Sequence, residues 1–134
     1  MAFAEWIPRL EVHVAVIDAQ HQQLFAWINR LWDAYQIEDE TELKAVLGFL
    51  VEYAVLHFST EEALMDQARF PSADAHKDLH REFKAKVAEF EQRQAAAFHS
   101  VTPELLEYLL EWLVGHIAHE DRKLGAFLVS KGMG

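Results

Sequence analysis

Residues 43–61 read LKAVLGFLVEYAVLHFSTE, and this stretch decides the fold. Apolar side chains recur in it at helical spacing, as in an amphipathic helix whose apolar face packs on a core. His57 continues that face, and Glu61 follows one helical turn later. The stretch therefore predicts a helix that carries an imidazole and a carboxylate into the interior of a helical protein. Its apolar face consists of Leu43, Val46, Leu47, Leu50 and Ala54.

Capping residues predict where this helix and the preceding one begin. Asp39 and Glu42 have the spacing of a capping box, which would open a helix that ends near Gln67. Asp18 is predicted to be the N-cap of an earlier helix over residues 19–36, with one apolar stripe.

Two proline-containing breaks divide the remainder of the chain. Phe70-Pro71-Ser72 interrupts the helical pattern, and a third helix is predicted over residues 73–97. Thr102-Pro103 is predicted to start a fourth helix that runs to about Val129, because a hydroxyl followed by proline is typical of a helix N-terminus.

Four amphipathic helices with short connections predict an all-α fold, an antiparallel up-down-up-down four-helix bundle. Residues 1–17 contain Pro8 and alternate apolar and polar side chains, so we expect an extended N-terminal arm packed on the outside. The bundle is expected to occupy residues 18–131, and residues 1–134 are expected to form a single domain.

Composition excludes several classes of function. The formal net charge of −10 argues against nucleic acid and anionic membranes as partners, because both attract clustered lysine and arginine. The absence of cysteine excludes disulfides, iron–sulfur clusters and thiolate zinc sites. We see neither a secretory signal nor a long uncharged apolar run, so a cytoplasmic protein without a transmembrane helix is expected. A monomer is also expected.

Other candidate metal ligands also occur at helical spacing. His76 and His80 are four residues apart and share a helix face. His116 and Asp121 are five apart, about 140° around an ideal helix, so a local distortion or a sideways side chain must bring them together. His21 lies on the core-facing side of the first predicted helix.

Each pair taken alone has an ordinary explanation, such as a surface hydrogen bond or a solvated histidine pair. Together they would place several histidines and two carboxylates in one interior, where unpaired carboxylates are costly and rare. A shared two-metal centre would satisfy them. Imidazole and carboxylate without thiolate favour iron or manganese. Two octahedral ions sharing two carboxylates and one solvent-derived oxygen have six further positions, and five histidines leave one open.

Four motifs carry a resemblance to a known family over roughly residues 6–130. The chain resembles the hemerythrin family, specifically its bacterial single-domain form, and Trp6 and Leu64-Met65 are similar to that family as well. The motifs are Ile17-Asp18-Ala19-Gln20-His21, His57-Phe58-Ser59-Thr60-Glu61-Glu62, His76-x₃-His80 and His116-Ile117-x₃-Asp121.

The resemblance implies two iron ions joined by an oxo or hydroxo bridge. It assigns one iron to His76, His80 and His116 and the other to His21 and His57, with Glu61 and Asp121 bridging both. Dioxygen would bind reversibly at the iron that has two histidines. The implied apolar lining of the oxygen pocket is Leu24, Phe58, Trp112, Leu113 and Ile117.

Some positions depart from the family pattern or stand outside it. His13 and Arg69 replace common glycines, and Leu124 takes a place often held by tyrosine. We expect these departures to affect ligand access and autoxidation rather than the ligands themselves. Glu62 is expected to be solvated, because it points about 100° away from Glu61 on an ideal helix.

Three functions fit such a centre. The first is reversible dioxygen binding for carriage, storage or delivery, with an oxygen-consuming enzyme as a candidate recipient. The second is a di-iron oxidase or peroxidase; the Glu-x-x-His motifs of ferritin-like oxidases do not occur here, which favours a binding protein over an enzyme. The third is an oxygen or redox sensor, which would have to act through a separate partner.

Overall fold

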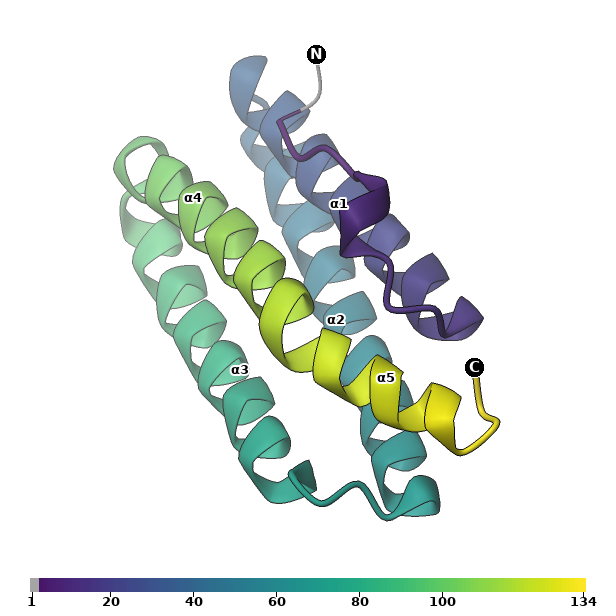
Figure 1. The fold of residues 1–134 in the computed structure, drawn as a ribbon. Coiled ribbons are helices and arrows are strands. Elements are labelled where there is room, and N and C mark those ends of the chain that lie inside the picture. The colour runs from purple at the N-terminus through teal and green to yellow at the C-terminus, as the bar shows by residue number, and fades with distance from the viewer. Residues whose placement is uncertain (1–2) are drawn as a thin grey trace.

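The computed structural model describes residues 3–134, except for the side chains of residues 98–100. The chain folds into an all-α bundle in which consecutive long helices run antiparallel (Figure 1). The long helices are α1 (Ala15–Gln36), α2 (Glu40–Ala68), α3 (Ala73–Ala96) and α4 (Phe98–His116), and α4 continues through a π-helical turn, η2 (Ile117–Asp121), into α5 (Arg122–Ser130). The predicted four-helix bundle is confirmed.

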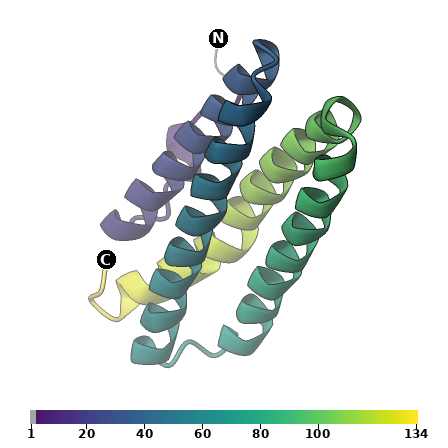
Figure 2. The same ribbon diagram turned by 180° about the vertical axis from the view of Figure 1, so that it is seen from behind.

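The N-terminal segment lies along the outside of α1 and reaches α5, as predicted for an arm (Figure 1). It contains one short 3₁₀ helix, η1 (Pro8–Leu10), and it buries Ala4, Leu10 and Val12. Viewed from behind, α2 passes in front of the C-terminal part of the chain, and the C-terminal end lies beside the start of α1 (Figure 2). The arm and α5 therefore close the same end of the bundle.

The prediction that Asp18 caps the first helix is wrong. Helix α1 already begins at Ala15, and the Asp18 carboxylate instead accepts hydrogen bonds from the backbone N–H groups of Val12 (2.8 Å) and His13 (3.1 Å). A carboxylate in the first turn can satisfy the preceding backbone as readily as the helix end. Asp18 thus fastens the arm to α1.

The predicted cap of α2 is confirmed, because the Asp39 side chain accepts a hydrogen bond from the backbone N–H of Glu42 at 3.0 Å.

The predicted start of the fourth helix at Thr102 is wrong, since α4 begins at Phe98. The Thr102 hydroxyl lies fully buried and accepts a hydrogen bond from Nε2 of Gln94 at 3.1 Å. The buried Val101 belongs to the helical turn that precedes Pro103.

Both glycine replacements, His13 and Arg69, occupy left-handed backbone. Arg69 ends α2 with φ 57°, and Phe70 N–H then donates to the carbonyl of Met65 at 2.9 Å. His13 has φ 66° at the turn between the arm and α1. Glycine is favoured in this conformation because it has no Cβ, and an ordinary residue there costs about 1–2 kcal/mol. Both departures therefore strain turns of the backbone.

Helix α2 alone, among the described residues, is long and apolar enough to cross a membrane by length and composition. Its mean hydropathy over the best window is 1.3, and 39% of that window is buried in the bundle. The same helix turns His57 and Glu61 into the interior, which is the behaviour of a core helix.

Replacing Gly125 with alanine is expected to destabilise the protein by about 1–3 kcal/mol, because the core is already filled at this point. A Cβ on Gly125 would lie 2.8 Å from Cβ of Val12 and closer still to its carbonyl oxygen, so the arm would have to move off α5. Gly115 is the matched control: a Cβ there meets nothing within 4 Å, and Gly115→Ala is expected to stabilise α4 by about 0.5–1 kcal/mol. Urea denaturation of both variants measures the difference, and equal effects would contradict it.

Candidate metal centre

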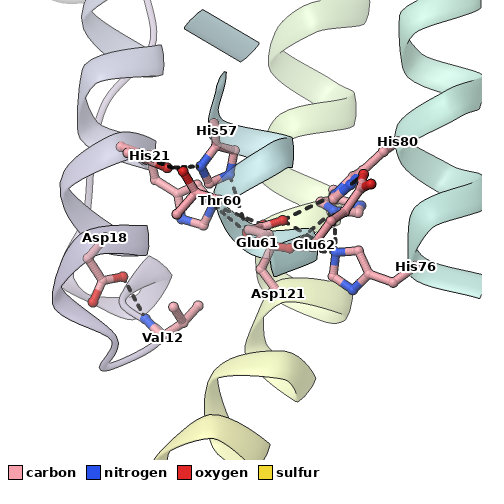
Figure 3. Close-up of polar contacts among 12 residues, drawn as sticks. Val12, Asp18, His21, His57, Thr60, Glu61, Glu62, His76, His80 and Asp121 are labelled. Carbon is pink, nitrogen blue, oxygen red and sulfur yellow. Dashed lines mark hydrogen bonds and ion pairs between the residues drawn. The ribbon is translucent and has the colours of Figure 1, made fainter. Parts of the chain in front are cut away.

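Every predicted ligand side chain comes to one place between the helices (Figure 3). Helix α1 supplies one imidazole, α2 an imidazole and a carboxylate, α3 two imidazoles, α4 one imidazole and η2 one carboxylate. None of the seven residues is more than 6% exposed. They are His21, His57, Glu61, His76, His80, His116 and Asp121.

The seven residues form two overlapping groups, each able to hold a metal ion. Within a group, the candidate ligand atoms lie within 4.8 Å of one another. We call the group with His76, His80 and His116 the three-histidine position, and the group with His21 and His57 the two-histidine position. Glu61 and Asp121 belong to both.

The two oxygens of Glu61 face different positions. Its Oε1 lies 3.1 Å from Nε2 of His80 and 3.5 Å from Nε2 of His76. Its Oε2 lies 3.3 Å from Nε2 of His57 and 3.5 Å from Nε2 of His21. This is how a carboxylate that bridges two metal ions must be turned.

Asp121 is divided in the same way. Its Oδ1 lies 3.0 Å from Nε2 of His76 and 3.1 Å from Nε2 of His116, while its Oδ2 lies 2.9 Å from Nε2 of His21. Both carboxylates therefore stand between the two positions, each with one oxygen toward either side.

Of the two alternatives that the sequence left open for His116 and Asp121, a helix distortion or a sideways side chain, the structure shows the helix distortion. η2 is a π-helical turn, and the N–H of Arg122 donates to the carbonyl of Ile117, five residues back. A wider turn brings residues five apart onto one face, and single π turns are frequent at functional sites. The extra residue in the turn brings the side chain of Asp121 onto the same face as His116.

The buried polar atoms of the cluster fit a metal centre. Nε2 of His21 and of His80, and all four carboxylate oxygens of Glu61 and Asp121, are buried without a well-formed hydrogen bond among the described residues. Such groups are expensive to bury unless something pairs with them. Nitrogen and oxygen donors converging in this number suit two first-row metal ions without thiolate ligands.

Charge in the metal-free cluster is redistributed onto the histidines. Burial alone would lower the pKa of His21, but its contacts with Asp121 and Glu61 outweigh that effect and raise the pKa to about 9. The same opposing effects raise the pKa of His76 to about 9. Burial would raise the pKa of both carboxyl groups, but the facing imidazoles hold each pKa well below its usual range.

The metal-free protein is therefore expected to lose stability as the pH rises from about 6.5 to 9. A histidine whose folded pKa lies above 6.5 contributes stability below 6.5, and that contribution disappears as the pH passes its folded pKa near 9. Metal affinity should rise over the same range, because a metal must displace these protons. Urea denaturation with chelator, alongside metal titrations at pH 6.5 and 9, measures both trends. If stability and metal affinity both rose, or both fell, between pH 6.5 and 9, the raised pKa values of His21 and His76 would be contradicted.

Two residues beside the cluster contact histidines through Nδ1, the ring nitrogen that faces away from the cluster. Oε1 of Gln20 lies 2.8 Å from Nδ1 of His57, and Oε2 of Glu62 lies 2.8 Å from Nδ1 of His80. The prediction that Glu62 is solvated is wrong, because its side chain is only 29% exposed and reaches across to α3. The rotation between neighbours on one helix cannot show what the next helix presents, although an inward-facing His80 did imply an acceptor for its second nitrogen.

An apolar cavity adjoins the cluster. Four of the predicted oxygen-pocket residues line it, namely Leu24, Phe58, Trp112 and Leu113. Ile117 is fully buried but is not part of the lining. The Phe58 ring stacks on His80 with centroids 4.0 Å apart, and Trp112 stacks on His116 at 4.3 Å. Sequence reasoning missed Ile28, Leu50, Ala54, Phe83 and Leu109, which complete the lining.

Known proteins are similar to this chain in both sequence and fold. Residues 12–128 match the model of the hemerythrin HHE cation binding domain. A bacteriohemerythrin of Pseudomonas aeruginosa (strain LESB58) is 36% identical over 121 residues, covering 90% of this chain and 78% of that protein. A bacteriohemerythrin of Methylococcus capsulatus (strain ATCC 33009 / NCIMB 11132 / Bath) is 28% identical over 129 residues, covering 96% and 98%.

The structural comparison agrees with the sequence comparison. The crystal structure of a wild-type hemerythrin superposes with a TM-score of 0.84 at 26% identity, covering 95% of this chain and 98% of the other. The matched segment contains all seven clustered residues, and the cluster is consistent with a site for two metal ions. On sequence, fold and buried cluster alike, this chain belongs to the hemerythrin family.

Proposed function

We propose that the protein binds dioxygen reversibly at a di-iron centre held by the seven clustered residues. The observation that carries this proposal is the placement of each bridging carboxylate, with one oxygen toward each position, beside an apolar cavity. Two iron ions bound there would supply the electrons for dioxygen binding. Carriage, storage and delivery to an oxygen-consuming enzyme would all use this one reversible step.

The residues of the chain contribute charge balance and exclusion of water. Glu61 and Asp121 offset the positive charge of two cations, and the five imidazoles fill most of the remaining coordination without adding charge. The cavity of about 10 Å³ has room for about one water-sized sphere and no carboxylate, hydroxyl or imidazole in its lining. A dry cavity without an acid or base favours release of oxygen unchanged over turnover, so we propose a binding protein rather than an enzyme.

Cycling oxygen over the iron-loaded protein tests this function. The chain is loaded with ferrous iron under anaerobic conditions, its iron content is measured, and the visible spectrum is recorded while air and inert gas alternate. Two irons per chain and a charge-transfer band that repeatedly appears and disappears are expected. Irreversible bleaching with release of hydrogen peroxide would contradict carriage and indicate oxidase chemistry. Far fewer than two irons would contradict both.

A further inference from the structure

Among the described residues, His57 and His80 each have a partner on the ring nitrogen that faces away from the cluster, and the two partners differ in charge. His57, at the two-histidine position, faces the neutral amide of Gln20. His80, at the three-histidine position, faces the carboxylate of Glu62 (Figure 3). Both contacts are 2.8 Å long. The geometry of the two contacts is matched, but their charge is not.

A hydrogen-bond chain fixes the orientation of Gln20. The Thr60 hydroxyl donates to the carbonyl of Leu56 at 3.1 Å, so its oxygen is free to accept, and Nε2 of Gln20 donates to it at 3.2 Å. The amide oxygen of Gln20 must then face His57, whose Nδ1 can only donate. This places the Nε2 lone pair of His57 toward the cluster.

Glu62 gives His80 the same tautomer with a stronger acceptor. An ionised carboxylate only accepts, so Nδ1 of His80 donates and Nε2 faces Glu61 at 3.1 Å. A carboxylate behind a ligating histidine increases the basicity of the ligand more than a neutral acceptor does. The side chain of Glu62 is 29% exposed, and His80 is its only ion-pair partner within 4.0 Å among the described residues, although its charge also acts at longer range on Lys77.

We propose that Glu62 and Gln20 are positioning residues that make the two metal positions electronically unequal. Glu62 makes the ligands of the three-histidine position stronger electron donors. Gln20 is neutral, so the ligands of the two-histidine position remain weaker donors. The inequality in charge thus adds to the inequality in the number of histidines. This inference rests on the proposed function only in taking iron as the metal.

Two nearly isosteric substitutions test the proposal by moving the charge. Glu62→Gln removes the carboxylate behind His80, and Gln20→Glu places one behind His57, where Thr60 can turn its hydroxyl to donate to it. Midpoint potentials of the iron-loaded protein are measured by spectroelectrochemistry without oxygen. Glu62→Gln is expected to raise the potential and Gln20→Glu to lower it, each by about tenfold in the redox equilibrium, or about 59 mV for one electron.

The opposite signs separate an electronic effect from loose packing. Asp66→Asn is the matched control for net charge, since Asp66 lies one turn beyond Glu62, is 65% exposed and pairs with Lys77. The midpoint potential of Asp66→Asn should shift much less than that of Glu62→Gln. Shifts of one sign in both test variants, or a Glu62→Gln shift no larger than that of Asp66→Asn, would overturn the proposal.

A second measurement keeps the inference distinct from oxygen binding. Cobalt(II) affinity of the metal-free full chain should fall about tenfold in Glu62→Gln and rise about tenfold in Gln20→Glu. A protein that binds cobalt or iron in this pattern but does not bind oxygen reversibly would refute the proposed function alone. Normal oxygen cycling with unchanged affinities and potentials would refute this inference alone.

Discussion

Asp121→Asn is expected to reduce the metal content from two ions per chain to one or fewer. Asp121 presents Oδ1 to the three-histidine position and Oδ2 to the two-histidine position, so the substitution weakens both positions together. An amide also removes one of the two negative charges that offset the cations. Metal analysis after dialysis measures the effect. Glu120→Gln is the matched control: this carboxylate lies in the same π turn, interacts with Lys123 at 3.8 Å, and should retain both metals.

The same substitution should also change the metal-free protein. Without the Asp121 carboxylate, the pKa values of His21 and His76 lose a main cause of their rise to about 9. Removing one partner from a buried ion pair costs about 3–5 kcal/mol, so the variant should be less stable near pH 6.5. Its stability should then fall less steeply toward pH 9. Full metal content in Asp121→Asn, or an unchanged pH profile, would show that Asp121 does not lie between the two positions.

The clustering of the seven candidate ligands could be predicted from sequence, because residues four apart on a helix point in the same direction. His57 and Glu61 continue an apolar stripe, so that pair was expected to face inward. His76 and His80 share one face of their helix, and the sequence alone left a solvated pair open; the structure buries both. The spacing of His116 and Asp121 contradicted an ideal helix, and the distortion followed only from the requirement that both reach one site. Local periodicity alone does not predict a π turn.

Two of the three errors arose where a side chain could interact with either of two neighbours. Asp18 could cap its own helix or bind the arm, and it binds the arm. Glu62 could reach water or the adjacent helix, and it reaches His80. In both cases the choice depends on tertiary contacts, which propensity and capping rules do not contain. Those contacts matter most around the cluster, where the second partner of a ligand comes from another helix.

Phe58→Ala is expected to cost about 3–5 kcal/mol of the free energy of unfolding, the usual range for a buried phenylalanine. The Phe58 side chain is 1% exposed, and its ring contacts Phe83 and Trp112 edge-on, with centroids 5.6 Å and 5.9 Å away. Phe49 on the same helix is 53% exposed and contacts Trp27, so Phe49→Ala should cost less than about 1.5 kcal/mol. Urea denaturation of both variants gives the comparison, and similar losses would contradict a core role for Phe58.

Phe58→Ala is also expected to accelerate autoxidation of the iron-loaded protein. The Phe58 ring both stacks on His80 and forms one wall of the cavity, so its removal frees an imidazole and admits water together. If the protein binds oxygen as proposed, water admitted to the cavity would supply a proton for irreversible loss of that oxygen. Autoxidation should then accelerate about tenfold or more, which corresponds to a barrier about 1.4 kcal/mol lower. Phe58→Leu refills most of the volume without the stacking, and should recover slow autoxidation if dryness is the cause. Fast autoxidation in both variants would instead assign the protection to the ring stacked on His80.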